Sequence, residues 1–231
     1  MDKIPVKSKR KALLALLLVF APASILIFIS SIGCEHKFQK LADFGKIKPF
    51  VFIDADNKTR SSSEFKNEIV LITTIQNDCP NVCAISLWHL NQLIYQHIRK
   101  NSHKKMKQVR IISFVTDGKG NPVKNLNEVR SSLKDLAEGY DPKLWIIANG
   151  DARKTYDISN NGQSLLQKGD NYFGGEAFQE LLLLIDKAGN LRMVLPGNEE
   201  GLIRRMKENI ALLQKEYDKI CLLYTSPSPR D

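Results

Sequence analysis

Apolar runs with two different periods alternate through the middle of the chain. Short apolar runs typical of strands occupy residues 49–53, 69–75, 109–116, 144–148, 181–186 and 191–195, and the first two are rich in β-branched residues. Apolar residues recur at helical spacing over residues 83–100, 125–138 and 199–219. The run at 109–116 is almost continuously apolar, which favours a strand buried on both faces among parallel neighbours. This order predicts the α/β class, a mixed sheet flanked by helices.

The N-terminal part has a different pattern. Residues 12–33 contain no charged side chain and follow a basic leader, residues 1–11. A helix of that length crosses the roughly 30 Å hydrocarbon core of a membrane. The sequence therefore predicts a single transmembrane anchor in the cytoplasmic membrane, with the leader inside and the rest of the chain facing the periplasm. An alternative is a lipoprotein anchored through Cys34, which follows Ser31-Ile32-Gly33.

These patterns set the expected domain boundaries. After the anchor, residues 34–48 are expected to be a linker and residues 49–220 the folded domain. Residues 221–231 (CLLYTSPSPRD) replace the amphipathic pattern with three apolar residues and two Ser-Pro pairs. This string resembles the translated read-through of a sequencing adapter, so we leave it out of the domain.

Charge argues against a nucleic-acid partner. The chain has a formal net charge of +9, and residues 1–11 hold five basic residues against one acidic residue. The other basic cluster, residues 99–110, contains no aromatic side chain on which a base could stack. That cluster is typical of a solvated helix end and loop.

One pair of cysteines has the spacing of a reactive site. Cys79 and Cys83 follow the apolar run 69–75 and precede the helical run, in the string Cys-Pro-Asn-Val-Cys. A cysteine at the N-terminus of a helix has a lowered thiol pKa, which makes Cys79 the expected nucleophile. Two close thiols form a disulfide in an oxidising compartment, and as thiolates they suit the soft ion Cu(I). A permanent structural disulfide is the alternative.

The order of elements around Cys79-Pro80-Asn81-Val82-Cys83 resembles the thioredoxin superfamily. The three residues between the cysteines and the N-terminal anchor resemble its Sco/SenC branch. That resemblance implies a thioredoxin-like fold and copper binding or thiol redox chemistry in assembly of the copper site of cytochrome c oxidase. It also implies that Cys79 and Cys83 are the copper or redox thiols, with Asp117 a weaker candidate ligand, and that no organic cofactor is needed.

The sequence departs from the Sco/SenC pattern where the third copper ligand is expected. The family has a histidine eight residues before the position of Asp186, and here that residue is Phe178. The four histidines, all at or before residue 103, are more typical of surface or packing positions: His36, His89, His97 and His103. The complete ligand set of two sulfurs and one nitrogen is therefore not supported.

Three functions remain open at this stage. The first is a metallochaperone-like protein that binds Cu(I) through Cys79 and Cys83 and serves a copper-site subunit of the oxidase. The second is a thiol–disulfide oxidoreductase with a thiol redox partner and no copper role. The third is a non-catalytic protein that uses the same fold to bind a partner. The sequence alone does not decide whether the protein is an enzyme.

Overall fold

The computed structural model describes residues 20–22, 24–25, 40–77, 82–103, 106, 108–160, 163–164 and 176–225. It divides into two compact units, Met1–Gln39 and Lys40–Asp231. The residues described in the first unit are helical; the leader, most of the expected anchor and Cys34 lie outside the described residues. Within the described parts, no helix has both the length and the apolar character needed to span a membrane.

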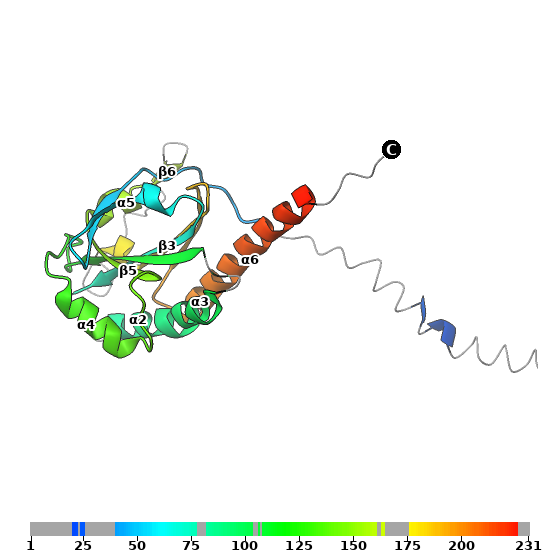
Figure 1. The fold of residues 1–231 in the computed structure, drawn as a ribbon, viewed down its shortest axis with the longest axis horizontal. Coiled ribbons are helices and arrows are strands. Elements are labelled where there is room, and N and C mark those ends of the chain that lie inside the picture. The colour runs from blue at the N-terminus through cyan, green and yellow to red at the C-terminus, as the bar shows by residue number, and fades with distance from the viewer. Residues whose placement is uncertain are drawn as a thin grey trace, which may run out of the picture. The chain divides into compact units, whose positions relative to one another are not determined.

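The second unit is built around a seven-stranded mixed sheet (Figure 1). Its strand order is β2-β1-β5-β4-β3-β8-β9. The three central strands run parallel, and β1 and β8 join them in antiparallel fashion on either side. The strands are β1 (Val51–Asp54), β2 (Thr59–Ser61), β3 (Ile69–Gln76), β4 (Val109–Thr116), β5 (Trp145–Asn149), β8 (Leu181–Ile185) and β9 (Leu191–Pro196), with a separate small pair β6 (Ser159–Asn160) and β7 (Gln163–Ser164).

Helices and short helical turns connect these strands. The predicted helix at 83–100 is continuous from Val82 to Asn101, but its middle turn is a π-helix. The elements are η1 (Ser62–Phe65), α2 (Val82–His89), the π-helical η2 (Leu90–Tyr95), α3 (Gln96–Asn101), α4 (Asn127–Leu136), α5 (Ala152–Tyr156), η3 (Ala177–Glu180) and α6 (Glu200–Thr225). The mixed α/β architecture predicted from the sequence is therefore confirmed.

The end of α6 differs from the prediction. We expected the helix to end at Lys219, and it runs on to Thr225. The apolar residues 221–223 do not stop it, because cysteine and leucine are compatible with helical backbone. The helix ends two residues before Pro227, and a residue that precedes proline is disfavoured in helical conformation.

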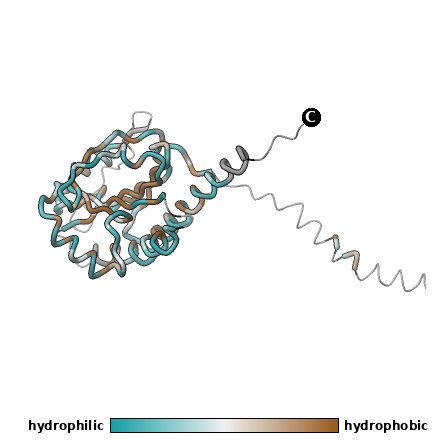
Figure 2. The backbone as a smooth tube through the Cα atoms, viewed as in Figure 1, coloured by the Kyte–Doolittle hydropathy of each residue, from teal (hydrophilic) through white to brown (hydrophobic). Residues whose placement is uncertain are grey.

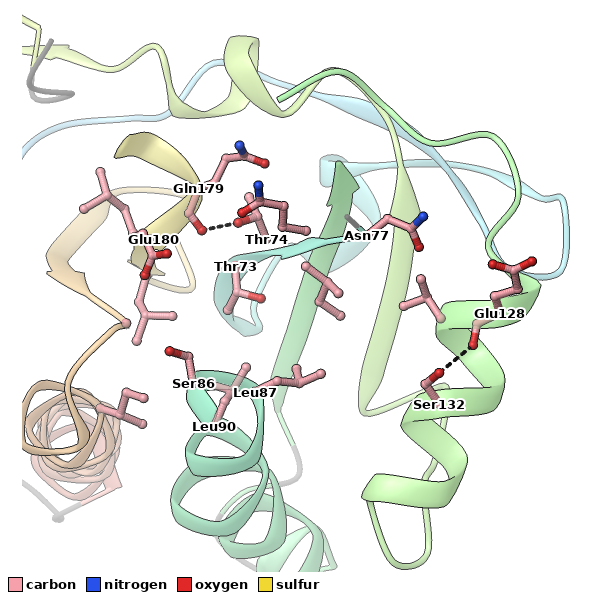
Figure 3. Close-up of a pocket in the computed structure, with 17 residues that line it drawn as sticks. Thr73, Thr74, Asn77, Ser86, Leu87, Leu90, Glu128, Ser132, Gln179 and Glu180 are labelled. Atoms are coloured by element: carbon pink, nitrogen blue, oxygen red, sulfur yellow. Dashed lines mark hydrogen bonds between the residues drawn. The ribbon is translucent and has the colours of Figure 1, made fainter. Parts of the chain in front are cut away.

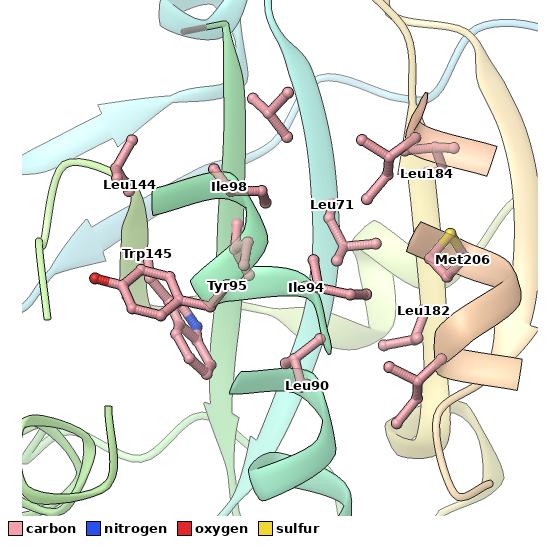
Figure 4. Close-up of a cluster of buried hydrophobic side chains, with 14 of the residues drawn as sticks. Leu71, Leu90, Ile94, Tyr95, Ile98, Leu144, Trp145, Leu182, Leu184 and Met206 are labelled. Atoms are coloured by element: carbon pink, nitrogen blue, oxygen red, sulfur yellow. The ribbon is translucent and has the colours of Figure 1, made fainter. Parts of the chain in front are cut away.

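The two faces of the sheet bury separate hydrophobic clusters, and the central strands are its most apolar part (Figure 2). Neighbouring residues of β3 alternate between the clusters: Leu71 belongs to one and Ile72 to the other. The first cluster packs the helices α2 to α4 and α6 against the sheet, with Tyr95 and Trp145 among its fully buried side chains (Figure 4). The second contains the aromatic residues of β1, η1, α5 and η3.

The chain before β1 is already part of the domain. Residues 41–47, which we expected to lie in a linker, pair with the β8–β9 hairpin. Phe44 donates its N–H to the carbonyl of Leu191 at 2.9 Å, and Leu191 donates to the carbonyl of Gly45 at 2.9 Å. Arg192 donates to the carbonyls of Leu41 and Ala42 at 3.0 and 2.9 Å. The first unit accordingly ends at Gln39, ahead of these contacts.

Candidate thiol site at the end of strand β3

The cysteine motif spans the junction between β3 and α2. β3 ends at Gln76, and Asn77 donates its N–H to the carbonyl of Thr116 at 2.8 Å, which fixes the chain just before the motif. Cys83 is the second residue of α2. Cys79 lies outside the described residues. The motif thus falls between the end of β3 and the first turn of α2, and the pairing of the two cysteines stays a prediction.

A cavity of about 410 Å³ opens at this junction (Figure 3). Its described lining comes from segments far apart in the sequence: the end of β3 with Asn77, the helices α2, η2, α4 and α6, and the segment 179–182 with Gly197. Ser86 and Leu87 of α2 line it, and they follow Cys83 by three and four residues. The part of α2 that follows the cysteine motif therefore borders the cavity.

Two carboxylate side chains belong to this cavity. Figure 3 shows Glu180, at the end of η3, on one side and Glu128, in α4, on the other. Glu180 is half-buried. Burial raises the pKa of its carboxyl, because the charged form loses hydration. The sequence analysis did not single out Glu180, since an isolated glutamate next to an apolar strand carries no signal of its own.

Gln179 attaches η3 to the ends of β3 and β4. Its side-chain carbonyl accepts a hydrogen bond from the hydroxyl of Thr116, and its backbone carbonyl accepts one from the hydroxyl of Thr74. Its amide also donates to the carbonyl of Gly118 at 3.3 Å. These contacts hold Glu180, the next residue, at the cavity.

Phe178 occupies the position at which the family resemblance places a copper-binding histidine. Its ring is buried in the second hydrophobic cluster, with the ring of Tyr156 at 5.5 Å between centroids and the guanidinium of Arg153 5.5 Å from its centroid. Gly120 has a φ of +76°, and a Cβ there would come within 2.6 Å of the Phe178 ring. Phe178 is therefore a packed core side chain, and its ring has no donor atom for a metal.

Asp117 uses its carboxylate within its own loop. The side chain accepts hydrogen bonds from the backbone N–H groups of Lys119 and Asn121, both at 2.8 Å, and from the amide of Asn121 at 2.9 Å. These hydrogen bonds hold the pKa of Asp117 below the ordinary value, and the bonds from Asn121 have the largest effect. The geometry is that of a turn, and a role in copper binding stays a prediction.

The described histidines lie on or just after the first long helix. His89 ends α2 with its ring 5.0 Å from that of Trp88, and burial lowers the pKa of His97 in α3. His103 follows α3, and His36 lies outside the described residues. Across the part of the chain that the structure describes, no three His, Cys, Asp or Glu residues come together in a group able to hold a metal ion.

Replacement of Glu180 by glutamine is expected to stabilise the protein at neutral pH and to have little effect at pH 4. The raised pKa means that the folded state favours the protonated carboxyl, so the contribution of Glu180 to stability falls as the pH rises past the ordinary value of 4.5. Glutamine stays neutral throughout. Urea unfolding between pH 4 and pH 8 measures the difference in the free energy of unfolding between E180Q and wild type. A difference that does not change with pH contradicts the prediction.

The order of strands, the cysteine junction before α2 and the closing β8–β9 hairpin define a thioredoxin-like α/β protein. The sequence model of the SCO1/SenC family matches residues 39–214. The chain therefore belongs to the SCO1/SenC family.

Solved structures with the same fold are distant in sequence. BsSco, a member of the Sco family of cytochrome c oxidase assembly proteins described with a disulfide switch, is 18% identical, with a TM-score of 0.51 over 77% of this chain and 97% of that one. A candidate electron transfer protein from Aquifex aeolicus is 12% identical, with a TM-score of 0.50 over 76% and 98%. Yeast Sco1 with copper bound is 15% identical, with a TM-score of 0.49 over 72% and 89%. A comparison with curated protein sequences gives no match.

Proposed function

We propose that this chain is a membrane-anchored, extracytoplasmic Sco-like protein whose thiols Cys79 and Cys83 bind Cu(I), exchange disulfides, or do both, during assembly of the copper site of cytochrome c oxidase. The observation that supports it most is the match to the SCO1/SenC family combined with the CxxxC string at the β3–α2 junction. The membrane anchor rests on the uncharged run 12–33 behind the basic leader.

The donor set favours Cu(I) as the copper state. Two thiolates satisfy Cu(I), a soft ion, whereas Cu(II) prefers further nitrogen or oxygen donors. The buried Phe178 ring supplies no such donor where the family resemblance places one. Copper is here the cargo of the protein, and Cys79 and Cys83 are the residues that would hold it.

The cysteine pair without a nitrogen ligand also supports thiol–disulfide exchange, the second candidate function. A CxxxC pair without a nitrogen ligand keeps all that disulfide exchange needs, a nucleophilic thiolate and a second thiol. BsSco is described with a disulfide switch. An oxidoreductase without a copper role is therefore the alternative that the site favours over simple partner binding.

Cys79 and Cys83 are expected to form a reversible disulfide, with Cys79 the more reactive thiol. The N-terminus of a helix stabilises a nearby thiolate, and Cys79 precedes the start of α2. Mass spectrometry after oxidation should show the loss of about two daltons, for two hydrogens, in the peptide that holds both residues. Brief alkylation of the reduced protein should label Cys79 first. Two thiols that stay free under oxidising conditions, or faster labelling of Cys83, contradict the prediction.

The domain is expected to be digested when a membrane-impermeant protease is added to intact spheroplasts. The basic leader favours a cytoplasmic N-terminus, so the residues after the anchor face outward. A cytoplasmic marker enzyme should stay intact in the same sample. Protection of the domain until the membrane is lysed contradicts the proposed localisation. Substitution of Cys34 by serine distinguishes a transmembrane anchor from a lipid anchor, because only a lipoprotein loses its attachment to the membrane.

A further inference from the structure

The cavity beside the cysteine junction has a charge opposite to that of the whole chain. The protein carries a formal charge of +9, yet the described lining of the cavity contains Glu128 and Glu180 and no lysine, arginine or histidine. Glu180 is half-buried, and no described residue forms an ion pair or hydrogen bond with its carboxylate. Glutamate is rarely buried without a partner, and the described residues supply no cation that would compensate its lost hydration.

About half of the remaining lining is apolar, which suits the aliphatic stem of a long side chain. Leucine, valine and isoleucine side chains form walls next to the two carboxylates: Leu87, Leu90, Val129, Leu182 and Ile203. Lysine and arginine combine an aliphatic stem with a cationic head, and they bury the stem against apolar surface. A bare metal ion fits less well, since the described residues offer no group of three ligands here.

The cavity borders the chain on both sides of the cysteine motif. Asn77, two residues before Cys79, lines it, and so do Ser86 and Leu87 of α2, three and four residues after Cys83. On the open side of the same helix, the apolar side chains of Ile85 and Trp88 are 57% and 48% exposed. The helix that follows the motif therefore presents both a border of the acidic cavity and an exposed apolar surface.

We propose that this cavity binds a lysine or arginine side chain of the partner segment that approaches Cys79 and Cys83. The proposal rests on the proposed function for the identity of the reactive thiols, but binding of a cation by the cavity stands independently of it. Glu180 supplies the charge, and the apolar wall from α2, α4 and α6 holds the stem.

Peptide exchange kinetics on the full chain in detergent micelles test the proposal. The probes are short peptides whose cysteine is activated as a mixed disulfide with thionitrobenzoate. They differ at one residue, which is lysine, norleucine or glutamate, placed one, two or three positions from the cysteine. The protein thiolate attacks the peptide sulfur, the bond to thionitrobenzoate breaks, and thionitrobenzoate leaves with the electron pair. Its absorbance gives the rate.

At the best spacing, the lysine peptide should react about three- to tenfold faster than the norleucine peptide, and the glutamate peptide more slowly still. Added salt should reduce the differences in reaction rate between the three peptides. E180Q should remove most of the preference for lysine. The matched control is E200Q, since Glu200 pairs with Arg204 in α6 and is not among the described lining residues. Equal rates for all three peptides, or an undiminished preference in E180Q, overturn the proposal.

A second measurement separates this proposal from the proposed function. N-acetyl-lysine methylamide, which has no sulfur, should shift the amide NMR signals of Thr74, Asn77 and Ser86 in wild type, more weakly in E180Q. N-acetyl-norleucine methylamide is the neutral control. If the thiols react with no peptide but these shifts occur, thiol exchange fails and the cation site stands. If the shifts are absent or equal for the two compounds, the cation site is overturned.

Discussion

The reduced protein is expected to bind one Cu(I), and the C79S/C83S variant is expected to lose that binding completely. Two thiolates are sufficient ligands for Cu(I), and serine hydroxyls are poor donors for a soft ion. Anaerobic titration against a chromophoric Cu(I) chelator measures the affinity. Cu(II) should bind weakly, or oxidise the two thiols to a disulfide, since Phe178 offers no further donor.

A matched control exists in the same chain. Cys221 lies in α6, outside the family match, so C221S should bind Cu(I) as the wild type does. A wild-type protein that does not bind Cu(I) removes the copper role and leaves thiol exchange. A stable Cu(II) complex with strong thiolate charge-transfer absorption shows that a donor was missed. Glu176, Gln179, Met193 and Asp117 are then the first residues to substitute.

Substitution of Asp186 by alanine is expected to lower the free energy of unfolding by about 3–5 kcal/mol, the usual cost of breaking a buried ion pair. Its carboxylate accepts a hydrogen bond from Arg192 at 3.1 Å, and the two side chains are 4% and 9% exposed. It also accepts the N–H groups of Ala188 and Asn190, which closes the β8–β9 turn. Among the described residues, alanine leaves the buried guanidinium of Arg192 with Glu216 as its single acidic partner.

Urea unfolding at pH 7 measures this loss, and an exposed ion pair provides its control. The carboxylate of Asp157 lies 3.2 Å from the ammonium of Lys48, with both side chains more than 60% exposed. D157A should therefore cost no more than about 1 kcal/mol. A D186A variant as stable as D157A contradicts the argument from burial.

The sequence predicted the central strands well, because β3, β4 and β5 are largely buried on both faces and about two thirds of their residues are apolar. The strand 109–116 agrees with β4 at both ends. The short elements β2, η1 and η3 were not predicted, since three or four residues show no period. The π-helical turn η2 was also invisible, because apolar spacing does not distinguish it from an α-helical turn.

The site was predictable only in part. Spacing along the chain placed Cys79 and Cys83 between a strand and a helix, since that relation is local. The cavity joins residues 73–77 to Glu128, Glu180 and Ile203, which tertiary packing alone brings together. The family resemblance identified position 178 as unusual, but only the structure shows that its side chain is part of the core.

The pairing of residues 41–47 with the hairpin determines where a fragment of this protein can begin. β9 is an outer strand of the sheet, and residues 44–47 bond to its first residue and to the turn before it. A fragment that starts at residue 49 would uncover those backbone groups and take two carbonyl partners from Arg192. Uncovered strand edges pair with other chains and promote aggregation. A stable, monomeric fragment therefore has to retain residue 40 and everything after it in the domain.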